Sequence, residues 1–265
     1  MCRHLAYLGP PASLRSLLID PPHSLYRQAW APRRQRHGTV NADGFGVGWY
    51  AADDPVPARY RQGGPMWADV SLPDIARVVR SGAVLAAVRS ATPGTAAGAE
   101  AAAPFGGGPW LFSHNGAAQH WREWAEPAVL PSLEALVDSA FLWALTLRRL
   151  RAGGAMAAAL AGTIAAAEAA GRPGRFNFLL TDGRSIAATA CGDTLWYRRS
   201  PGAVTVASEP DDDGPDWTEV PDRHVLTATA GPVRVRPLAE WSADPPTERA
   251  TADGSDVSTE GILAS

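Results

Sequence analysis

The chain begins Met1-Cys2-Arg3-His4, and this short stretch carries the strongest indication of both fold and chemistry. The side chain of Cys2 is small enough to permit removal of Met1, which would leave a cysteine with a thiol and a free α-amine. A thiol is a good nucleophile, and the amine of the same residue can act as its general base. The reference pKa of an α-amine, about 7.7–8.0, is close to neutrality. The alternative interpretation is a small residue at a ragged terminus, so the rest of the chain must decide.

The composition excludes several classes of protein. With 265 residues, 46% of them hydrophobic, the chain is long enough to bury a substantial core. A formal net charge of −3 predicts no general affinity for nucleic acid or for an anionic membrane. No apolar run is long enough to span a bilayer, and no secretory signal pattern is present. Two cysteines, Cys2 and Cys191, make no disulfide framework, so we expect a cytoplasmic protein.

The types of residue present also limit the chemistry. The chain contains no lysine, which excludes a Schiff-base lysine and a P-loop lysine. No histidine and cysteine pair has the spacing of a zinc site, and the run Asp211-Asp212-Asp213 is interpreted as a solvated loop. We therefore expect neither a metal nor a cofactor.

The hydrophobic pattern predicts strands, then helices, then strands again. Glycines alternate with Phe45, Val47 and Trp49, which indicates a strand whose backbone is closely approached on one face. Asp182-Gly183 is a strong signal for a hairpin. This order does not suit a doubly wound parallel sheet and fits an α+β fold of two packed sheets with helices outside. Strands are predicted for 2–8, 45–49, 82–88, 110–114, 176–180, 185–190, 194–199, 204–207, 224–229 and 233–236, helices for 13–20, 71–80, 139–151 and 155–170, a loop for 93–109, and a disordered tail for 243–265.

Five segments in a fixed order resemble one known family. They are Met1-Cys2-Arg3-His4, Asn41-Ala42-Asp43-Gly44-Phe45-Gly46-Val47-Gly48, Arg89-Ser90-Ala91-Thr92, Ser113-His114-Asn115-Gly116 and Val137-Asp138-Ser139. Together they resemble the class II glutamine amidotransferase domain, an N-terminal-nucleophile hydrolase, over about residues 2–240. The resemblance implies a four-layer αββα sandwich of two mainly antiparallel sheets, formed by a single domain over residues 2–242.

The resemblance also implies catalytic roles. Cys2 would attack the γ-carbonyl of a glutamyl group and form a thioester. Asn115, through its side-chain amide, and Gly116, through its backbone N–H, would bind the oxyanion of the tetrahedral intermediate. Asn-Gly is also a common turn pair, and an ordinary turn is the alternative interpretation of these two residues.

Three further residues would select the glutamyl group. Arg89 would bind its α-carboxylate, Thr92 would add a hydroxyl, and Asp138 would pair with its α-ammonium. The alternative interpretation of Asp138 is a helix N-cap. The family's synthases often carry tryptophan and histidine where this chain has Ser90 and Pro93, so the carboxylate pocket can be arranged differently here.

The activity within the family depends on what surrounds the motifs. Because the chain continues for only one domain, we expect no ammonia-consuming domain in the same chain. Cys2 to Leu5 and residues 31–44 look like a stand-alone branch that hydrolyses a small γ-glutamyl conjugate of a betaine. Its quaternary ammonium would need an aromatic face, and Trp30, Trp49 and Trp110 are candidates, although each can equally be a core residue.

Other activities remain open from the sequence. One alternative is a stand-alone amidotransferase-like protein that hydrolyses glutamine or supplies ammonia to a partner. Another is a non-catalytic binding subunit, against which the joint presence of Cys2, Arg89, Asn115, Gly116 and Asp138 argues. The sequence contains no signal for the oligomeric state.

Overall fold

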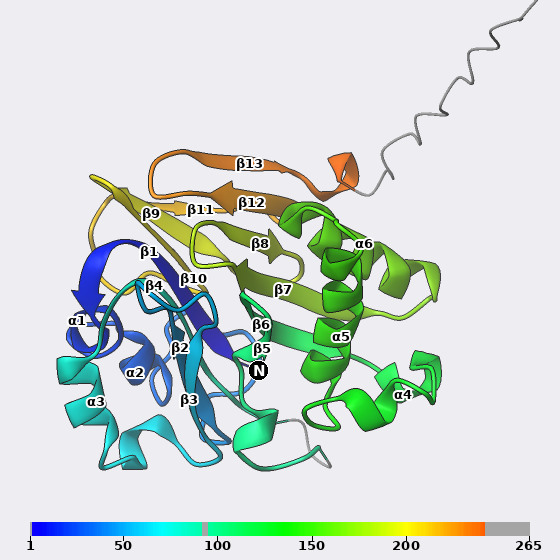
Figure 1. The fold of residues 1–265 in the computed structure, drawn as a ribbon, viewed down its shortest axis with the longest axis horizontal. Helices are drawn as coiled ribbons and strands as arrows, with labels where there is room; N and C mark the ends of the chain where they lie inside the picture. The colour runs from blue at the N-terminus through cyan, green and yellow to red at the C-terminus, as the bar shows by residue number, and fades with distance from the viewer. Residues whose placement is uncertain (1, 92–94, 242–265) are drawn as a thin grey trace, which may run out of the picture.

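Two antiparallel β-sheets form the centre of the molecule (Figure 1). The computed structural model describes residues 2–91 and 95–241, so the predicted tail, 243–265, lies outside the described residues. One sheet has the strand order β11-β9-β10-β1-β4-β2-β3 and the other β13-β12-β8-β7-β6-β5. The strands of the first sheet are β1 (Arg3–Ser13), β2 (Phe45–Trp49), β3 (Ala58–Gln62), β4 (Arg80–Val88), β9 (Trp196–Ser200), β10 (Ala203–Ala207) and β11 (Trp217–Glu219). Those of the second are β5 (Phe105–Gly107), β6 (Trp110–Ala118), β7 (Gly174–Thr181), β8 (Ile186–Ala190), β12 (His224–Ala228) and β13 (Val233–Pro237).

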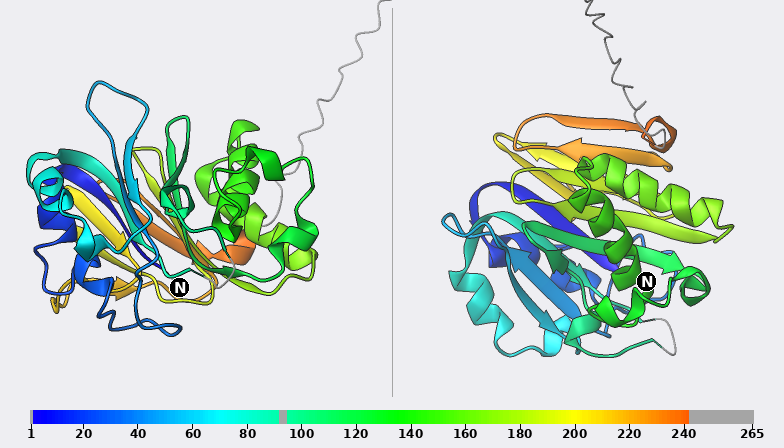
Figure 2. Two further views of the ribbon diagram at one scale, coloured as in Figure 1. Left: turned by 90° about the horizontal axis from the view of Figure 1, so that it is seen from below. Right: turned by 45° about the vertical axis from the view of Figure 1, so that its right-hand side comes forward.

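Helices cover the outer faces of both sheets (Figure 2). The first sheet is covered by α1 (Leu14–Leu18), α2 (Leu25–Gln28) and α3 (Leu72–Val78). The second is covered by α4 (Trp121–Trp124), α5 (Asp138–Arg151) and α6 (Met156–Ala169). Short 3₁₀ turns lie at η1 (Met66–Ala68), η2 (Ala99–Ala101), η3 (Leu130–Ser132) and η4 (Leu238–Glu240). In the described part of the chain, no helix is both long and apolar enough to cross a membrane.

Three hydrophobic cores separate four layers. One core joins α1–α3 to the first sheet, a second fills the space between the sheets, and a third joins the second sheet to α4–α6. Each sheet therefore buries both faces, which explains why strands such as β4 and β8 read as continuous apolar runs. The predicted four-layer αββα sandwich is confirmed.

The alternation of side chains along two strands decides which motif residues face each other. In β1, Leu5 packs in the outer core, whereas Ala6 and Leu8 pack between the sheets. In β6, Leu111 packs between the sheets and Phe112 in the outer core. Because successive side chains of a strand point to opposite faces, His4 and Asn115 face the space between the sheets, and His114 and Gly116 face α5.

The glycines of β2 allow the close approach that the sequence predicts. A Cβ at Gly46 would collide with the carbonyl oxygen of Ala103. A Cβ at Gly48 would lie 2.6 Å from Cδ1 of Leu111 and 3.0 Å from Cγ of Pro104. The group that approaches this face of the strand is therefore the chain around β5 and β6.

Some elements were not predicted, and the reason is local. β3 has the sequence ARYRQ and lies mostly exposed at the edge of its sheet, so it shows no apolar alternation. The predicted loop 93–109 contains β5, which pairs with the start of β6 across a turn at Gly108. β1 extends to Ser13, past Pro10 and Pro11, because a register shift between Leu8 and Ala12 absorbs them.

Candidate active site

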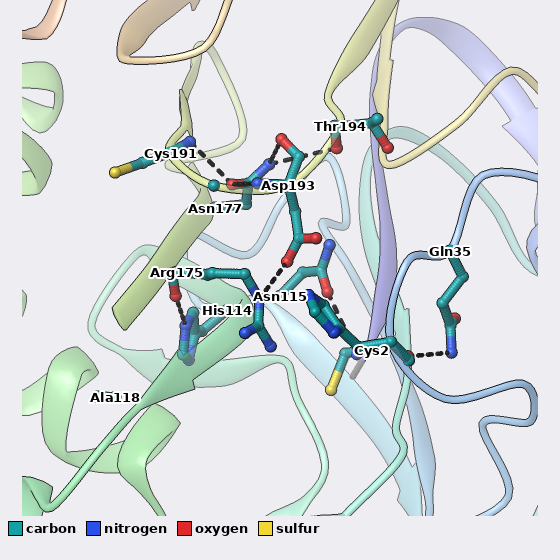
Figure 3. Close-up of polar contacts among 12 residues, drawn as sticks. Cys2, Gln35, His114, Asn115, Ala118, Arg175, Asn177, Cys191, Asp193 and Thr194 are labelled. Carbon is teal, nitrogen blue, oxygen red and sulfur yellow. Dashed lines mark hydrogen bonds and ion pairs between the residues drawn. The ribbon is translucent and has the colours of Figure 1, made fainter. Parts of the chain in front are cut away.

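Cys2 lies between the two sheets, against the side chain of Asn115 (Figure 3). The backbone nitrogen of Cys2 donates a hydrogen bond of 3.2 Å to Asn115 Oδ1, across 113 residues of sequence. The Asn115 side chain is completely buried, and its Nδ2 has no acceptor among the described residues. A buried hydrogen-bond donor without a partner lowers the stability of the folded protein. The site therefore presents an unused amide N–H beside the nucleophile.

The backbone N–H of Gly116 points to an open edge of β6. The N–H of Ala118 donates to Asp138 Oδ2 at 2.9 Å, and the N–H of Gln119 points the other way, to Pro173 O. N–H groups two residues apart in a strand point to the same side, so Gly116 N–H points as Ala118 N–H does. β5 pairs with residues 110–112 of β6, so no strand of the described residues pairs with this edge at residue 116.

Asn115 and Gly116 are strand residues, so the interpretation of this pair as a turn is wrong. Asn115 lies opposite Asn177 and Gly116 opposite Phe176 in the β6–β7 ladder. A side chain at position 116 would collide with the carbonyl oxygen of Arg175 and would lie 2.6 Å from Nε2 of His114. Glycine is therefore required here by packing.

His114 anchors this part of β6 to the neighbouring elements. Its Nε2 lies 2.9 Å from the carbonyl oxygen of Arg175, which can only accept, so Nε2 carries the proton. Its Nδ1 then accepts from the hydroxyl of Ser139, 3.0 Å away at the start of α5. Burial lowers the pKa of His114, although the nearby Asp138 carboxylate opposes this shift. The neutral imidazole therefore has a structural function in holding β6 against α5.

Asp138 is the first residue of α5, and the N-cap position is occupied by Val137. The interpretation of Asp138 as an N-cap is therefore wrong. One carboxylate oxygen accepts from the backbone N–H of Ala118 and the other from that of Ser139, at 2.9 and 2.8 Å. A partly exposed carboxylate is thus held in one orientation at the end of β6, close to the open edge where Gly116 lies.

Arg89 directly follows β4, the strand that pairs with β1 in the first sheet. In the β1–β4 ladder Arg3 is opposite Val88, and one further step of this register brings Arg89 level with Cys2. Arg89 donates to the carbonyl oxygens of Asp43 and Ala96 and to the hydroxyl of Thr95, at 2.9–3.1 Å. These bonds orient the largely buried guanidinium of Arg89, and the carbonyl oxygen of Asp43 is one of the acceptors that hold it.

Thr92, the third predicted residue for substrate binding, lies outside the described residues. The structure thus brings Cys2 and Asn115 together, with Gly116 next to Asn115 on β6. Arg89 lies level with Cys2 in the first sheet, and Asp138 lies beside the end of β6 in the second. Ser90, which departs from the synthase pattern, lies within reach of Gly38, because a Cβ on that glycine would be 3.8 Å from Ser90 Oγ.

Arg3 is an ionisable residue that sequence reasoning did not single out. Its side chain is fully buried, its Nε donates to Gln35 Oε1 at 3.2 Å, and Nη1 and Nη2 have no partner among the described residues. Burial lowers the pKa of Arg3, and the negative charges of Glu209 and Asp193 oppose this shift. Gln35 also accepts from Asn41 Nδ2, so the segments 31–38 and 41–44 converge beside Cys2. Proximity of Arg3 to Cys2 in the sequence was the only available signal.

His4 and Cys191 are kept uncharged at neutral pH. Burial, with the positive charge of Arg3, holds the pKa of His4 well below its ordinary value, and His4 Nδ1 lies 3.2 Å from Ser113 Oγ. Burial also raises the pKa of Cys191 to about 11, and the thiols of Cys2 and Cys191 are both free. At neutral pH, Cys191 is therefore an unreactive thiol.

Comparison with known proteins assigns the family. The family model for class II glutamine amidotransferases matches residues 19–246. The chain is 44% identical to the γ-glutamyl-hercynylcysteine sulfoxide hydrolase of Mycolicibacterium smegmatis, over 90% of this chain and 100% of that protein. It is 43% identical to the protein of the same name from Mycobacterium tuberculosis, over 86% of this chain and 93% of that one.

Solved structures support the same assignment. A structure described as a glutamine aminotransferase class-II domain protein from Silicibacter pomeroyi has a TM-score of 0.60 and 28% identity, over 89% of this chain and 99% of that chain. The glutamine phosphoribosylpyrophosphate amidotransferase of B. subtilis shares the fold, with a TM-score of 0.62 and 16% identity, over 89% of this chain and 49% of that one. An N-terminal-nucleophile fold, the motif residues at one end of the sandwich and a family match over most of the chain agree, and the chain belongs to the class II glutamine amidotransferases.

Proposed function

We propose that this protein hydrolyses γ-glutamyl-hercynylcysteine sulfoxide to glutamate and hercynylcysteine sulfoxide, with Cys2 as the nucleophile. The observation that carries the chemistry is the unpartnered Asn115 Nδ2 beside Cys2. The substrate is suggested by the two mycobacterial relatives, which bear that name and align over most of the chain. For a chain with two free cysteines, the cytoplasm is the compartment we propose.

The first step is acylation of Cys2. After removal of Met1, the α-amine of Cys2 accepts the thiol proton, and the sulfur attacks the γ-carbonyl carbon. The oxyanion that forms accepts hydrogen bonds from Asn115 Nδ2 and Gly116 N–H. The α-amine then gives the proton to the leaving nitrogen, and the C–N bond breaks to leave a γ-glutamyl thioester on Cys2.

The second step is hydrolysis of this thioester. Water attacks the same carbonyl carbon, and the α-amine accepts a proton from it. The same two donors bind the second oxyanion, after which the C–S bond breaks, the α-ammonium returns the proton to the Cys2 sulfur, and glutamate leaves. After removal of Met1, the hydrogen bond from Cys2 N to Asn115 Oδ1 would hold the new α-amine beside the oxyanion donor through both steps.

Recognition of the glutamyl group is assigned to both sides of Cys2. Arg89 and Thr92 bind the α-carboxylate, and Asp138 binds the α-ammonium. Arg89 lies level with Cys2 directly after β4, and the Asp138 carboxylate is oriented by two backbone N–H groups. A γ-glutamyl group with both α-substituents free satisfies a cation and an anion placed in this way.

A substrate without its α-ammonium is expected to react at least about 10²-fold more slowly in kcat/KM, because Asp138 would lose its partner in a partly buried site. The measurement compares a γ-glutamyl amide with its des-amino analogue. Asp138→Asn should reduce the difference between the two substrates, since the variant has no charge to pair. Equal rates for both substrates with the unmodified enzyme would contradict this function of Asp138.

The proposed function as a whole is tested with a panel of γ-glutamyl compounds. The enzyme, shown by mass spectrometry to lack Met1, is incubated with γ-glutamyl-hercynylcysteine sulfoxide, glutathione and glutamine, and glutamate release is followed. We expect the highest kcat/KM for the sulfoxide conjugate. A preference for glutamine would instead identify a glutamine-hydrolysing amidotransferase that supplies ammonia.

A further inference from the structure

An ion pair at the start of β7 lies beside the site and has no function in the mechanism described above. Arg175 Nε donates to Asp193 Oδ2 at 3.0 Å, and the Asp193 side chain is only 1% exposed. We propose that Arg175, oriented by Asp193, is a positioning residue whose positive charge faces the α-amine of Cys2 after removal of Met1 and favours the neutral amine that accepts the thiol proton. This inference rests on the mechanism in the proposed function.

The strand register places Arg175 on the same face as the oxyanion donor. In the β6–β7 ladder Arg175 is opposite Ala117, two residues after Asn115. Leu179, four residues further along β7, packs between the sheets, so Arg175 faces the same space. Arg175 is therefore a diagonal neighbour of Asn115, whose Oδ1 accepts from Cys2 N. Diagonal neighbours lie roughly 7–8 Å apart, which is within reach of a long side chain.

The Asp193 carboxylate fixes the direction of the guanidinium. The backbone N–H of Asp193 donates to Asn177 Oδ1 at 3.1 Å, and Asn177 Nδ2 donates to the carbonyl oxygen of Asp193 at 2.8 Å. The carboxylate held in this way binds Nε of Arg175, while Nη1 and Nη2 have no acceptor among the described residues. In Figure 3 the guanidinium extends from Asp193 toward the level of Cys2, away from Asn177.

Other charged or titratable groups surround the Cys2 amine. They are Arg3 and His4 on β1, Arg89 after β4, His114 on β6, Asp138 on α5 and Glu209 after β10. Burial lowers the pKa of both histidines, so they carry no charge at neutral pH. The charge of Arg3 is opposed by Glu209 and Asp193. Arg89 and Asp138 are assigned to the two charges of the glutamyl group, which leaves Arg175 as a cation with no assigned partner in the substrate.

A fixed positive charge changes the proton affinity of the amine in a known direction. The reference pKa of an α-amine is about 7.7–8.0, and a nearby cation lowers it because the ammonium form is repelled. More of the amine is then neutral at pH 7 and able to accept the thiol proton. The Asp193 carboxylate acts in the opposite sense. Removal of one charge or the other should therefore move the pKa of the amine in opposite directions.

The test measures the pH dependence of kcat/KM for γ-glutamyl-hercynylcysteine sulfoxide and for glutamine, in enzyme shown to lack Met1. The acid limb of this profile reports the base of the free enzyme. Arg175→Gln should raise the pKa of the limb by about 0.5–1 unit, with a loss of less than about twofold on the alkaline plateau. Arg175→Lys keeps the charge and should keep the limb. Asp193→Asn should lower the pKa of the limb.

Two further variants separate this electrostatic effect from a structural one. Arg175→Gln leaves a buried carboxylate unpaired and should lower the melting temperature. The double variant Arg175→Gln/Asp193→Asn removes both charges and should return the limb close to that of the unmodified enzyme. Arg172→Gln is the matched control, because Arg172 is 27% exposed against 26% for Arg175 and pairs with Glu123 at 2.7 Å. It should leave the limb unchanged.

Three results would overturn the inference. They are an unchanged limb in Arg175→Gln, an equal shift in Arg175→Lys, and shifts of the same sign in Arg175→Gln and Asp193→Asn, since each would make the ion pair purely structural. If the unmodified enzyme hydrolyses glutamine and not the sulfoxide conjugate, the proposed substrate fails, while the profile with glutamine still tests Arg175. If neither compound releases glutamate, both the proposed function and this inference fail.

Discussion

Replacement of Cys2 by alanine is expected to lower kcat for glutamate release by at least about 10⁴-fold, because the substitution removes the only nucleophile of the proposed mechanism. Alanine at this position still permits removal of Met1, so the α-amine is retained and mass spectrometry can verify it. The measurement is single-turnover glutamate release from a γ-glutamyl amide. Full activity in a processed Cys2→Ala enzyme would exclude the thioester mechanism.

Cys191 is the matched control for Cys2. Burial raises its pKa to about 11, so almost none of it is thiolate at neutral pH. A glutamine-like electrophile should label Cys2 alone, as peptide mapping can show. Cys191→Ala should keep full activity and should lose only the small free energy of unfolding that belongs to a buried sulfur atom. Labelling of Cys191 at a comparable rate would contradict the proposed site.

Asn115→Ala is expected to lower kcat about 10²–10³-fold with little change in KM, because an oxyanion donor acts on the transition state and not on bound substrate. The substitution should cost less stability than the loss of a fully bonded asparagine, since Asn115 loses one hydrogen bond, from Cys2 N, and its Nδ2 has no partner to lose among the described residues. Steady-state kinetics and thermal unfolding of the same sample measure the two effects. A rise in KM at constant kcat would assign Asn115 to substrate binding.

Asn177→Ala is the control for Asn115→Ala, because we expect it to reduce stability. It lies opposite Asn115 in the β6–β7 ladder and is equally buried. Its Oδ1 accepts from the backbone N–H groups of Cys191 and Asp193, and its Nδ2 donates to the carbonyl oxygens of Asp193 and Thr194. Asn177→Ala would leave these groups unsatisfied, at a cost of roughly 1–3 kcal/mol each. We therefore expect a large loss of stability there and a large loss of kcat at Asn115.

The sequence predicted most of the strands and the two long helices because the signals that identify them, hydrophobic periodicity and turn residues, are local. Period-two alternation and the Asp182-Gly183 pair identified most strands, and apolar stripes identified α5 and α6. The edge strands β3, β5 and β11 were not identified, because short or polar edge strands bury too few side chains to show a pattern. The family resemblance, carried by five short segments, then gave the αββα arrangement that periodicity alone left open.

For the site, the sequence by itself determined which residue types are available: a cysteine beside the initiator methionine, an Asn-Gly pair, an arginine and an aspartate at the motif positions. Tertiary structure alone decided that Asn115 is a strand residue bonded to Cys2, that Asp138 is not an N-cap, and that Arg3 is buried beside Gln35 and Glu209. Each of these facts depends on the register between strands that are far apart in the chain. Register is fixed by the summed packing of three cores and not by any local segment, which is why the contact between Cys2 and Asn115 could not be read from the residues that form it.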